Sequence, residues 1–389
     1  MAMKVIYYCQ HVLGIGHYFR SLEIARALHR HEVVLVTGGA SVDVDLPPHV
    51  TECRLPGLKM DSDFSILTPT DEGRSLEAVS EERAALLYSL FERSAPDLFV
   101  VELYPFGRKR FGFELLPVLE GLSQGNLGSA KVVCSLRDIL VEKEDQQAYE
   151  RRVLDLLNRY FDALLVHADP SAISLEETFL STADIAIPVV YTGFVTSRPE
   201  ADAGLKLRER LEIGGDETLI VASAGGGKVG AMLLRALIDA SFVLSRLGKL
   251  RVYIFTGPFM TSADFAALTE QAASMVGVRV ARFTKEFLSF LAAADLSVSM
   301  AGYNTCMNIL AAGVPSLVWP FGQNREQRLR AEKLAALGGM TVINDTDLKP
   351  ARLAEIVAEA LKKPRVSAGP AVNLAGAQET SKWLEAWLP

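Results

Sequence analysis

Residues 299–315 read SMAGYNTCMNILAAGVP, and this stretch decides the fold because it joins two strands through one helix. The short apolar run Leu296–Ser299 leads into it and Ser316–Trp319 follows it, and both runs are typical of strands. The helix opens after Gly302 and ends at Gly313, a residue type common just past a helix C-terminus. A strand, a helix and a second strand in this order predict parallel strands in an α/β sheet.

The same alternation extends towards both ends of the chain. Between residue 200 and this stretch, strands are expected at Leu219–Ala222, Val252–Phe255 and Val278–Phe283, with helices between them. Before residue 200 a helix is expected near His17–Arg30. The strands expected in that first series are Lys4–Cys9, Glu32–Thr37, Leu98–Leu103, Val132–Leu136 and Ala163–His167.

Two series of this kind predict two Rossmann-like domains that face each other across a cleft. A polar stretch near residue 200 separates them, so we expect an N-terminal domain over residues 1–197 and a C-terminal domain over residues 198–370. Residues 371–389 are expected to end in a helix that carries Trp383 and Trp387 on one face and packs back towards the N-terminal domain. The segment Leu46–Gly73 is rich in Pro, Asp and Ser, and we expect a loop-like interruption there.

The composition narrows the class of protein. The chain has 389 residues, 49% of them hydrophobic, and a formal net charge of −7, which argues against a nucleic-acid partner. Its four cysteines show no CxxC spacing, so neither a zinc site nor a disulfide framework is expected. With no signal peptide and no membrane-spanning run, a cytoplasmic location is expected. The basic and aromatic run FGRKRF at residues 106–111 is either a solvated loop or a peripheral contact with the inner membrane face.

Two loops are candidates for binding phosphate. In the quoted stretch, Gly302, Asn304 and Thr305 stand at a helix start, where backbone N–H groups and the helix dipole favour a diphosphate. In the sequence SAGGGK at residues 223–228, three glycines before a helix expose N–H groups that suit phosphate oxygens. The second loop lacks the P-loop pattern, and a flexible glycine turn explains it nearly as well.

A third loop, QHVLGIGH at residues 10–17, follows the first strand. Gly14 and Gly16 permit a tight turn, and His17 at the helix start is a candidate general base for an acceptor hydroxyl. A dinucleotide site is disfavoured, because the third glycine is absent and the second strand ends without an acidic residue. A tight turn with a capping histidine is the structural alternative.

Other polar residues lie at predicted strand ends. Glu102 and Asp138 are alternative bases to His17, although Asp138 also has Arg137 beside it as a local ion-pair partner. Asn308, one turn into the quoted helix, is placed to reach a ribose hydroxyl. Glu326 and Gln327 open a later helix and are candidates either for sugar hydroxyls or for helix capping.

These stretches together resemble a known family. Ser299–Gln327 resembles the donor-binding motif of GT-B glycosyltransferases, which include the lipid II-forming N-acetylglucosaminyltransferase. The whole chain is also similar to a bacterial group described as predicted glycosyltransferases. The segments that carry that similarity are QHVLGIGHYFRSLEIARAL, VELYPFGRKRFGFELLP, CSLRDILVEK, YFDALLVHADP, YTGF, AGYNT and REQRLRAEKL.

The resemblance implies a role for each matching residue. It places Gly14, Gly16 and His17 in the acceptor-side loop and Glu326 with Gln327 on the donor sugar. It assigns the nucleotide base to Phe283 and Thr284. It assigns binding of the donor phosphates to two groups of residues: Gly225, Gly226 and Gly227, and the helix start at Ala301, Gly302, Tyr303, Asn304 and Thr305. At the ribose position, where many relatives have Glu, this chain has Asn308.

The sequence therefore predicts an α/β protein of the GT-B fold that transfers a sugar from a nucleotide diphosphate sugar, most simply a UDP-sugar, to a hydroxyl acceptor. The acceptor is a lipid-linked precursor, a polysaccharide precursor or a small molecule. The donor is a co-substrate and no cofactor is expected. No metal site is expected either, because no DxD-like motif is placed at a predicted strand end; Asp43 and Asp45 fit that spacing but lie in the irregular region. The alternatives are a nucleotide-sugar 2-epimerase and a non-catalytic nucleotide-sugar binding protein, for which Asn308 is the main hint.

Overall fold

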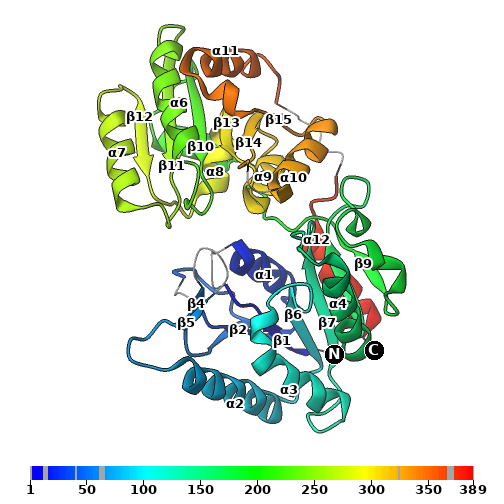
Figure 1. The fold of residues 1–389 in the computed structure, drawn as a ribbon. Helices are drawn as coiled ribbons and strands as arrows, with labels where there is room; N and C mark the ends of the chain where they lie inside the picture. Colours follow the sequence, from blue (N-terminus) through cyan, green and yellow to red (C-terminus); the bar gives the residue numbers. More distant parts are fainter. Residues whose placement is uncertain are drawn as a thin grey trace. The chain divides into compact units, whose positions relative to one another are not determined.

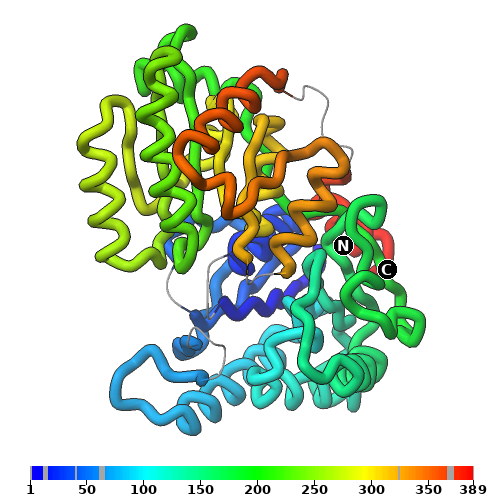
Figure 2. Tube along the Cα trace, turned by 45° about the horizontal axis from the view of Figure 1, so that its top comes forward, coloured from blue at the N-terminus to red at the C-terminus, as the bar shows by residue number. Residues whose placement is uncertain are grey.

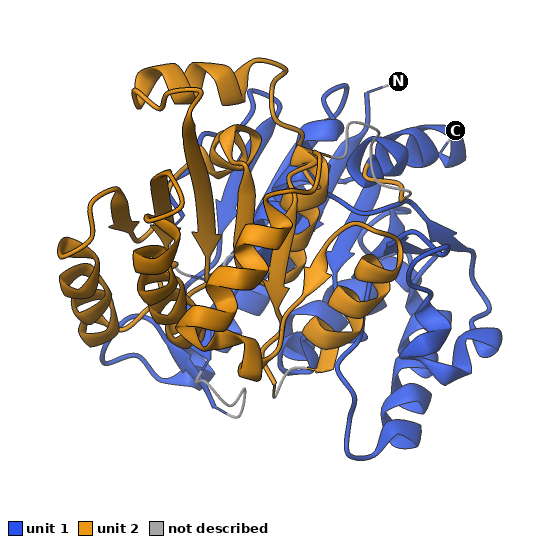
Figure 3. Cartoon of the chain, turned by 90° about the horizontal axis from the view of Figure 1, so that it is seen from above, with its two compact units in different colours: residues 1–195, 375–389 blue, residues 196–374 orange. Residues whose placement is uncertain are grey.

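The computed structural model describes residues 2–11, 16–39, 42–60, 66–322, 325–365 and 372–388. Gly14, predicted to lie in the acceptor-side loop, falls outside these residues. The chain divides into two compact units, which Figure 3 distinguishes by colour. Unit 1 comprises residues 1–195 and 375–389, and unit 2 comprises residues 196–374. Each unit is an α/β domain (Figure 1).

Unit 1 is built on a parallel sheet, which has seven strands in the described part of the chain. All of its neighbouring pairs are parallel, and the order is β3-β2-β1-β6-β7-β8-β9. The central strands are apolar on both faces, as expected for a parallel sheet covered by helices on each side. The strands are β1 (Lys4–Tyr8), β2 (Glu32–Thr37), β3 (Val50–Arg54), β6 (Leu98–Glu102), β7 (Lys131–Arg137), β8 (Ala163–His167) and β9 (Val189–Tyr191).

The expectation of a loop over residues 46–73 was wrong in part. Within it, β3 extends the main sheet, and β4 (Leu58–Met60) pairs with β5 (Leu67–Pro69) in an antiparallel hairpin. The edge strand β3 is mostly solvent-exposed and carries Glu52 and Arg54, so its sequence lacks the apolar run by which buried strands are recognised.

Helices cover both faces of the unit 1 sheet. Val5 and Tyr7 of β1 belong to a core shared with α1 and α12, whereas Tyr8 points to the other face and contacts α3. The helices are α1 (Gly16–Ala27), α2 (Leu76–Ser94), α3 (Gly112–Ser123), α4 (Gln146–Tyr160) and α12 (Gly376–Trp387), with short 3-10 helices η1 (Lys109–Phe111), η2 (Leu175–Glu177) and η3 (Leu180–Asp184).

The C-terminal helix α12 is part of unit 1, so both chain ends lie in this unit (Figure 2). Leu384 is fully buried in the core with α1, and the rings of Trp383 and Trp387 stack with centroids 4.8 Å apart. Glu385 contacts His31 at 3.3 Å. The helix thereby completes a domain from which it is separated in sequence by all of unit 2.

Unit 2 repeats the architecture with a sheet of order β12-β11-β10-β13-β14-β15, again parallel throughout its described residues. Numbered along the chain, this is the 3-2-1-4-5-6 order of the Rossmann fold. The strands are β10 (Glu217–Ser223), β11 (Lys249–Phe255), β12 (Val278–Ala281), β13 (Leu296–Met300), β14 (Ser316–Trp319) and β15 (Thr341–Val342). β12 ends at Ala281, short of the expected Phe283.

The unit 2 helices also lie on both sides of their sheet. α6 and α11 share a core with Ile220 and Ala222 of β10. The helices are α5 (Ala203–Arg210), α6 (Ala231–Leu244), α7 (Ser262–Ala273), α8 (Phe287–Ala293), α9 (Tyr303–Ala312), α10 (Arg325–Ala336) and α11 (Pro350–Ala360), with the 3-10 helix η4 (Asp345–Leu348). No described helix in either unit has the length and apolar character needed to cross a bilayer.

Each sheet has one point where the order of its strands reverses. In unit 1 it lies between β1 and β6, and in unit 2 between β10 and β13. Ligands of open parallel sheets bind at the carboxyl ends of the strands beside such a point. The residues that follow these four strands are therefore where each unit is expected to bind a ligand.

Candidate functional site

In unit 1, a histidine and a glutamate meet at the switch point. His17 stands in the first turn of α1, just after the loop from β1, and Glu102 is the last residue of β6. His17 Nδ1 lies 2.6 Å from Glu102 Oε1, and Arg20 donates to the same oxygen. The Glu102 side chain is fully buried, whereas that of His17 is 20% exposed. The structure thus joins two residues that the sequence suggested as separate candidates for the base.

The pair defines the protonation of His17. An ionised carboxylate only accepts hydrogen bonds, so Nδ1 carries the proton and Nε2 carries the lone pair. Burial lowers the pKa of His17 to about 4, although the neighbouring Glu102 opposes this effect. The imidazole is therefore neutral near pH 7, which a general base requires.

Glu102 has a different role from His17. Burial alone would raise the pKa of Glu102, but His17, Arg20 and Arg108 outweigh it and hold that pKa well below the usual range. A carboxylate that stays ionised and hydrogen-bonded orients the imidazole better than it accepts a proton. Asp138 is also buried, after β7, where its Oδ1 accepts from the N–H of Ile139 at 2.9 Å. A role of Asp138 as base stays a prediction.

A second buried polar chain lies behind this pair, and the sequence analysis missed it. Tyr7 OH contacts Ser135 Oγ at 2.9 Å, and Ser135 Oγ contacts His167 Nε2 at 2.7 Å. His167 Nδ1 continues the chain to Thr192 Oγ1 at 2.8 Å. Burial lowers the pKa of His167 to about 3, so this imidazole is neutral as well. A histidine that ends the apolar run ALLVH was the available signal.

In unit 2, the glycine loop after β10 packs backbone against backbone. Gly225 and Gly227 have φ of +64° and +89°, values that side chains rarely adopt. A Cβ on Gly257, in the loop after β11, would lie 2.3 Å from the Gly225 carbonyl oxygen. Gly225 and Gly226 are exposed, whereas Gly227 is buried. Glycine is therefore required here because the chain must approach itself closely, and the exposed part presents main chain to a ligand.

The start of α9 lies beside this loop. Gly302 caps the helix with extended backbone and no side-chain cap hydrogen bond. Cβ atoms built on Gly225 and Gly302 would lie 3.7 Å and 4.0 Å from Thr305 Oγ1, so this hydroxyl is close to both glycines. The structure thus brings together the two predicted phosphate loops at the unit 2 switch point.

The predicted base-contacting residues lie at the β12 side of the sheet. Phe283 is 47% exposed, and Thr284 Oγ1 accepts from the N–H of Glu286 at 3.1 Å. Phe259, which the sequence analysis did not select, is 37% exposed, and its N–H donates to Gly226 at 2.9 Å. An exposed aromatic ring beside a glycine loop offers a stacking surface for a nucleobase.

The remaining donor-side predictions have local partners. Asn308 Oδ1 accepts from Thr196 Oγ1 at 3.0 Å, and Gln327 Oε1 accepts from the N–H of Phe321 at 3.2 Å. Ala301 is buried, and Tyr303 lies under the guanidinium of the buried Arg330, 5.5 Å from its ring centroid. Glu326 is in the first turn of α10. The Gln327 contact is with the loop before α10, and the choice between a sugar contact and helix capping stays open for Glu326 and Gln327.

The basic and aromatic run at residues 106–111 is divided by the fold. Phe106 and Phe111 are core residues, whereas Lys109 and Arg110 are exposed. The rings that would insert into a membrane are therefore buried, and charge alone remains for a surface contact.

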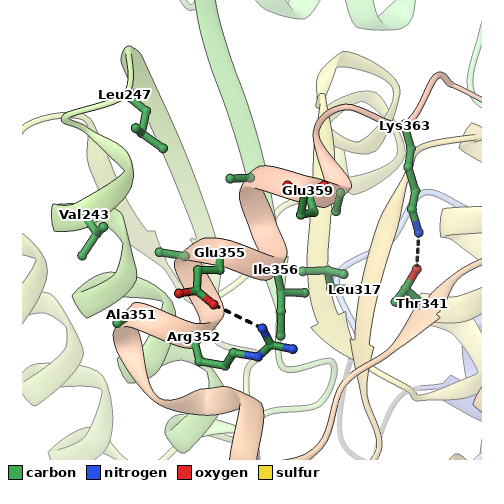
Figure 4. Close-up of a pocket in the computed structure, with 13 residues that line it drawn as sticks. Val243, Leu247, Leu317, Thr341, Ala351, Arg352, Glu355, Ile356, Glu359 and Lys363 are labelled. Atoms are coloured by element: carbon green, nitrogen blue, oxygen red, sulfur yellow. Dashed lines mark hydrogen bonds and ion pairs between the residues drawn. The ribbon is translucent and has the colours of Figure 1, made fainter.

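Elsewhere in unit 2, a hollow of about 740 Å³ lies between α6 and α11 (Figure 4). Arg352 and Glu355 pair on its α11 wall, and Lys363 reaches Thr341. Leu317 and Thr341 belong to the amino-terminal parts of β14 and β15, so the hollow is remote from the strand ends where ligands are expected. Among the described residues no group of three or more His, Cys, Asp or Glu side chains is arranged to hold a metal ion.

Comparison with known sequences matches most of unit 2 to a known domain family. Residues 223–382 match the glycosyltransferase family 28 C-terminal domain. The UDP-N-acetylglucosamine–N-acetylmuramyl-(pentapeptide) pyrophosphoryl-undecaprenol N-acetylglucosamine transferase of Brucella anthropi is 30% identical over 143 residues, 36% of this chain and 38% of that protein. An uncharacterized glycosyltransferase of Methanopyrus kandleri is 22% identical over 223 residues, 56% of this chain and 59% of that protein. The chain thus spans less than two thirds of the length of these relatives.

Solved structures resemble the whole chain. The calicheamicin glycosyltransferase is 17% identical, with a TM-score of 0.61 over 100% of this chain and 99% of its own. MurG of Acinetobacter baumannii is 14% identical, with a TM-score of 0.57 over 99% of each chain.

Two parallel Rossmann-like sheets and these likenesses define a GT-B fold, which confirms the fold class expected from the sequence. Within that class the chain resembles MurG, and its residues 223–382 match the glycosyltransferase family 28 C-terminal domain.

Proposed function

We propose that this protein is a glycosyltransferase that moves a sugar from a nucleotide diphosphate sugar to a hydroxyl acceptor. Unit 2 binds the donor, a UDP-sugar in the first instance, and unit 1 binds the acceptor. The observation that carries the proposal is the meeting of two phosphate-type loops, Gly225–Gly227 and Gly302–Thr305, inside the family 28 segment.

The donor side rests on main-chain chemistry. The first-turn N–H groups of α9 and its dipole stabilise a diphosphate, and the exposed glycines let phosphate oxygens approach the main chain of the neighbouring loop. The Thr305 hydroxyl, between the two, adds a donor. In the reaction, the same groups stabilise the negative charge that develops on the leaving nucleoside diphosphate.

The acceptor side rests on His17. Its Nε2 takes the proton of the acceptor hydroxyl, whose oxygen forms a bond to the anomeric carbon. The bond from that carbon to the β-phosphate oxygen breaks, and the nucleoside diphosphate leaves with the electron pair. Glu102 stabilises the imidazolium that forms, as the carboxylate partners of catalytic histidines do.

Donor binding is tested by thermal shift with UDP, GDP, dTDP and ADP and their sugars. One nucleotide series should raise the melting temperature. Thr305→Val should weaken the binding of that nucleotide series about tenfold, because one hydrogen bond to a charged group is lost. Thr305→Ser should retain the binding. If no nucleotide shifts the wild-type protein, the donor site is wrong and the transferase proposal falls with it.

Product analysis separates transfer from the alternatives. Incubation with the donor identified above and a mixture of hydroxyl acceptors should yield transferred sugar. A donor sugar epimerised at C2 would indicate the epimerase instead. Tight donor binding with neither product would favour a non-catalytic protein, in which the Thr196 contact of Asn308 replaces a stronger carboxylate contact to ribose.

A further inference from the structure

Arg108 is held at the unit 1 switch point by an unusual loop. Both Leu103 and Arg108 have positive φ, +66° and +57°, although neither is glycine. Such backbone is unfavourable for a residue with a side chain and persists where the surroundings over-determine it, often at functional sites. Here the loop between β6 and η1 turns back, with Gly107 N–H donating to the Leu103 carbonyl at 2.8 Å.

The Arg108 side chain is buried beside Glu102 and His17, and its Nε lacks a hydrogen bond among the described residues. It is only 8% exposed, and its Nε lies 3.9 Å from Glu102 Oε2, too far for a hydrogen bond. Within the described part of the chain, neither that nitrogen nor Glu102 Oε2 has a hydrogen-bond partner. His17 and Arg20 both bond to the other carboxylate oxygen.

The local charges do not cancel. Arg20 and Arg108 flank the single carboxylate of Glu102, and His17 is neutral near pH 7. Among these four side chains, one positive charge is left over. A buried guanidinium N–H without a hydrogen bond, such as that of Arg108 Nε, costs free energy that a ligand can recover. Its planar fork suits two oxygens of a phosphate or carboxylate.

We infer that Arg108 binds an anionic group of the acceptor, a phosphate or carboxylate, next to the hydroxyl that His17 activates. Arg108 and His17 contact the two oxygens of one carboxylate, so an acceptor that reaches both carries its anion close to its reacting hydroxyl. The assignment of the anion to an acceptor rests on the proposed function, whereas the anion site itself does not.

The experiment follows the imidazole resonances of histidine-labelled protein by NMR, with His17→Gln to assign the signal of His17. The probes are glycerol 3-phosphate and monomeric dihexanoyl-phosphatidylglycerol, which present the same anion as a small molecule and as a lipid headgroup. Either probe should perturb His17 and raise the midpoint of its titration, because an anion near the ring favours the imidazolium.

The variants identify the residue that binds. Arg108→Met should weaken binding at least about tenfold, the loss expected for one charge-assisted contact. Arg108→Lys should bind with intermediate affinity, since it keeps the charge and loses the fork. Arg110→Met, which removes an exposed arginine two residues away, is the matched control and should stay within about twofold of the wild type.

Each outcome decides the inference. Tighter binding of glycerol 3-phosphate supports a soluble anionic acceptor, and tighter binding of the lipid supports a lipid-linked one. Both readings require that Arg108→Met weakens the binding and that Arg110→Met does not. No response to either probe, or equal losses in Arg108→Met and Arg110→Met, overturns it. The thermal shift with UDP, measured on the same samples, shows that each variant is folded and reports separately on the donor site.

Discussion

His17 and Glu102 lie 85 residues apart in the sequence and 2.6 Å apart in the structure, and the proposed role of His17 as a base rests on this contact. The motif around residues 14–17 was enough to select the histidine. The sequence could not show that Glu102 orients it, because tautomer and orientation depend on which side chain faces Nδ1 in the folded sheet. Arg108 was missed for the same reason, since it reads as one cation in an exposed-looking basic run.

Replacing His17 with Gln should separate transfer from donor binding. Gln retains a donor for Glu102 but has no basic nitrogen, so kcat should fall by about 10²- to 10⁴-fold, the usual contribution of a general base. The nucleotide affinity of unit 2 should stay unchanged in thermal-shift titrations. A variant with near-normal kcat would move the role of base to another group, with Asp138 next to be tested by Asp138→Asn.

The pH dependence follows from the lowered pKa values of two histidines. His17 titrates at about 4 and His167 at about 3 in the folded chain, against an ordinary value of 6.5. Between pH 6.5 and these values the unfolded chain binds protons that the folded chain does not, so the free energy of unfolding should fall as the pH falls through this window. Urea unfolding at pH 7 and pH 5 should show the loss of stability, and this loss should be smaller in His17→Gln.

The pH dependence of the transfer rate is a separate prediction. The rate should stay on its plateau as the pH falls to about 4, where His17 becomes protonated and no longer acts as a base.

At the scale of elements, apolar runs located the buried strands well. The runs at Glu32–Thr37, Ala163–His167 and Ser316–Trp319 are strands with the same bounds in the structure. The edge strand β3 was missed because one-sided burial leaves a polar sequence. Strand ends were less certain, since β12 stops at Ala281 where the chain turns into a loop.

The loops that follow β10 and β11 pack closely against each other, and this contact can be tested by substitution. Gly257→Ala places a Cβ 2.3 Å from the Gly225 carbonyl oxygen at a φ of +87°, so the two loops must separate. Unit 2 should lose about 1–3 kcal/mol of stability from overpacking and strain, and donor affinity should fall because Gly225–Gly227 move.

The control for this variant is Gly215→Ala, at an exposed turn where an added Cβ meets nothing within 4 Å. It should leave both quantities unchanged. Urea unfolding and UDP thermal shifts measure them, and unchanged donor affinity in Gly257→Ala would show that the glycine loop does not hold the phosphates.

At the scale of the whole molecule, the alternation of strands and helices predicted two α/β domains and so the fold class. The 3-2-1-4-5-6 strand order of unit 2 was not predicted, because a helical crossover can place the next strand on either side of the last, and the order is visible only in the structure. Why α12 belongs with unit 1 is visible only in the folded chain: its buried Leu384 shares a core with residues of β1, α1 and β2, which lie more than 300 positions earlier in the sequence.

The last prediction uses the three tryptophans of the chain, which are divided between the units. Trp383 and Trp387 report on unit 1, and the buried Trp319, whose Nε1 donates to Asp345 at 2.8 Å, reports on unit 2. A Trp319→Phe protein keeps only the unit 1 tryptophans, and a Trp383→Phe/Trp387→Phe protein keeps only that of unit 2. Each should therefore follow the unfolding of one unit.

In the Trp319→Phe protein, which reports on unit 1, Leu384→Ala should lower the unfolding midpoint by the equivalent of about 2–5 kcal/mol, because it empties a fully buried site. In the Trp383→Phe/Trp387→Phe protein, which reports on unit 2, UDP should raise the unfolding midpoint. Leu384→Ala should have little effect there, since each unit has its own hydrophobic core. Lys382→Ala, at an exposed position of the same helix, is the control for the Leu384 substitution. If both reporters shift together with either perturbation, the units unfold as one cooperative body, and α12 then stabilises unit 2 as well as the unit in which it packs.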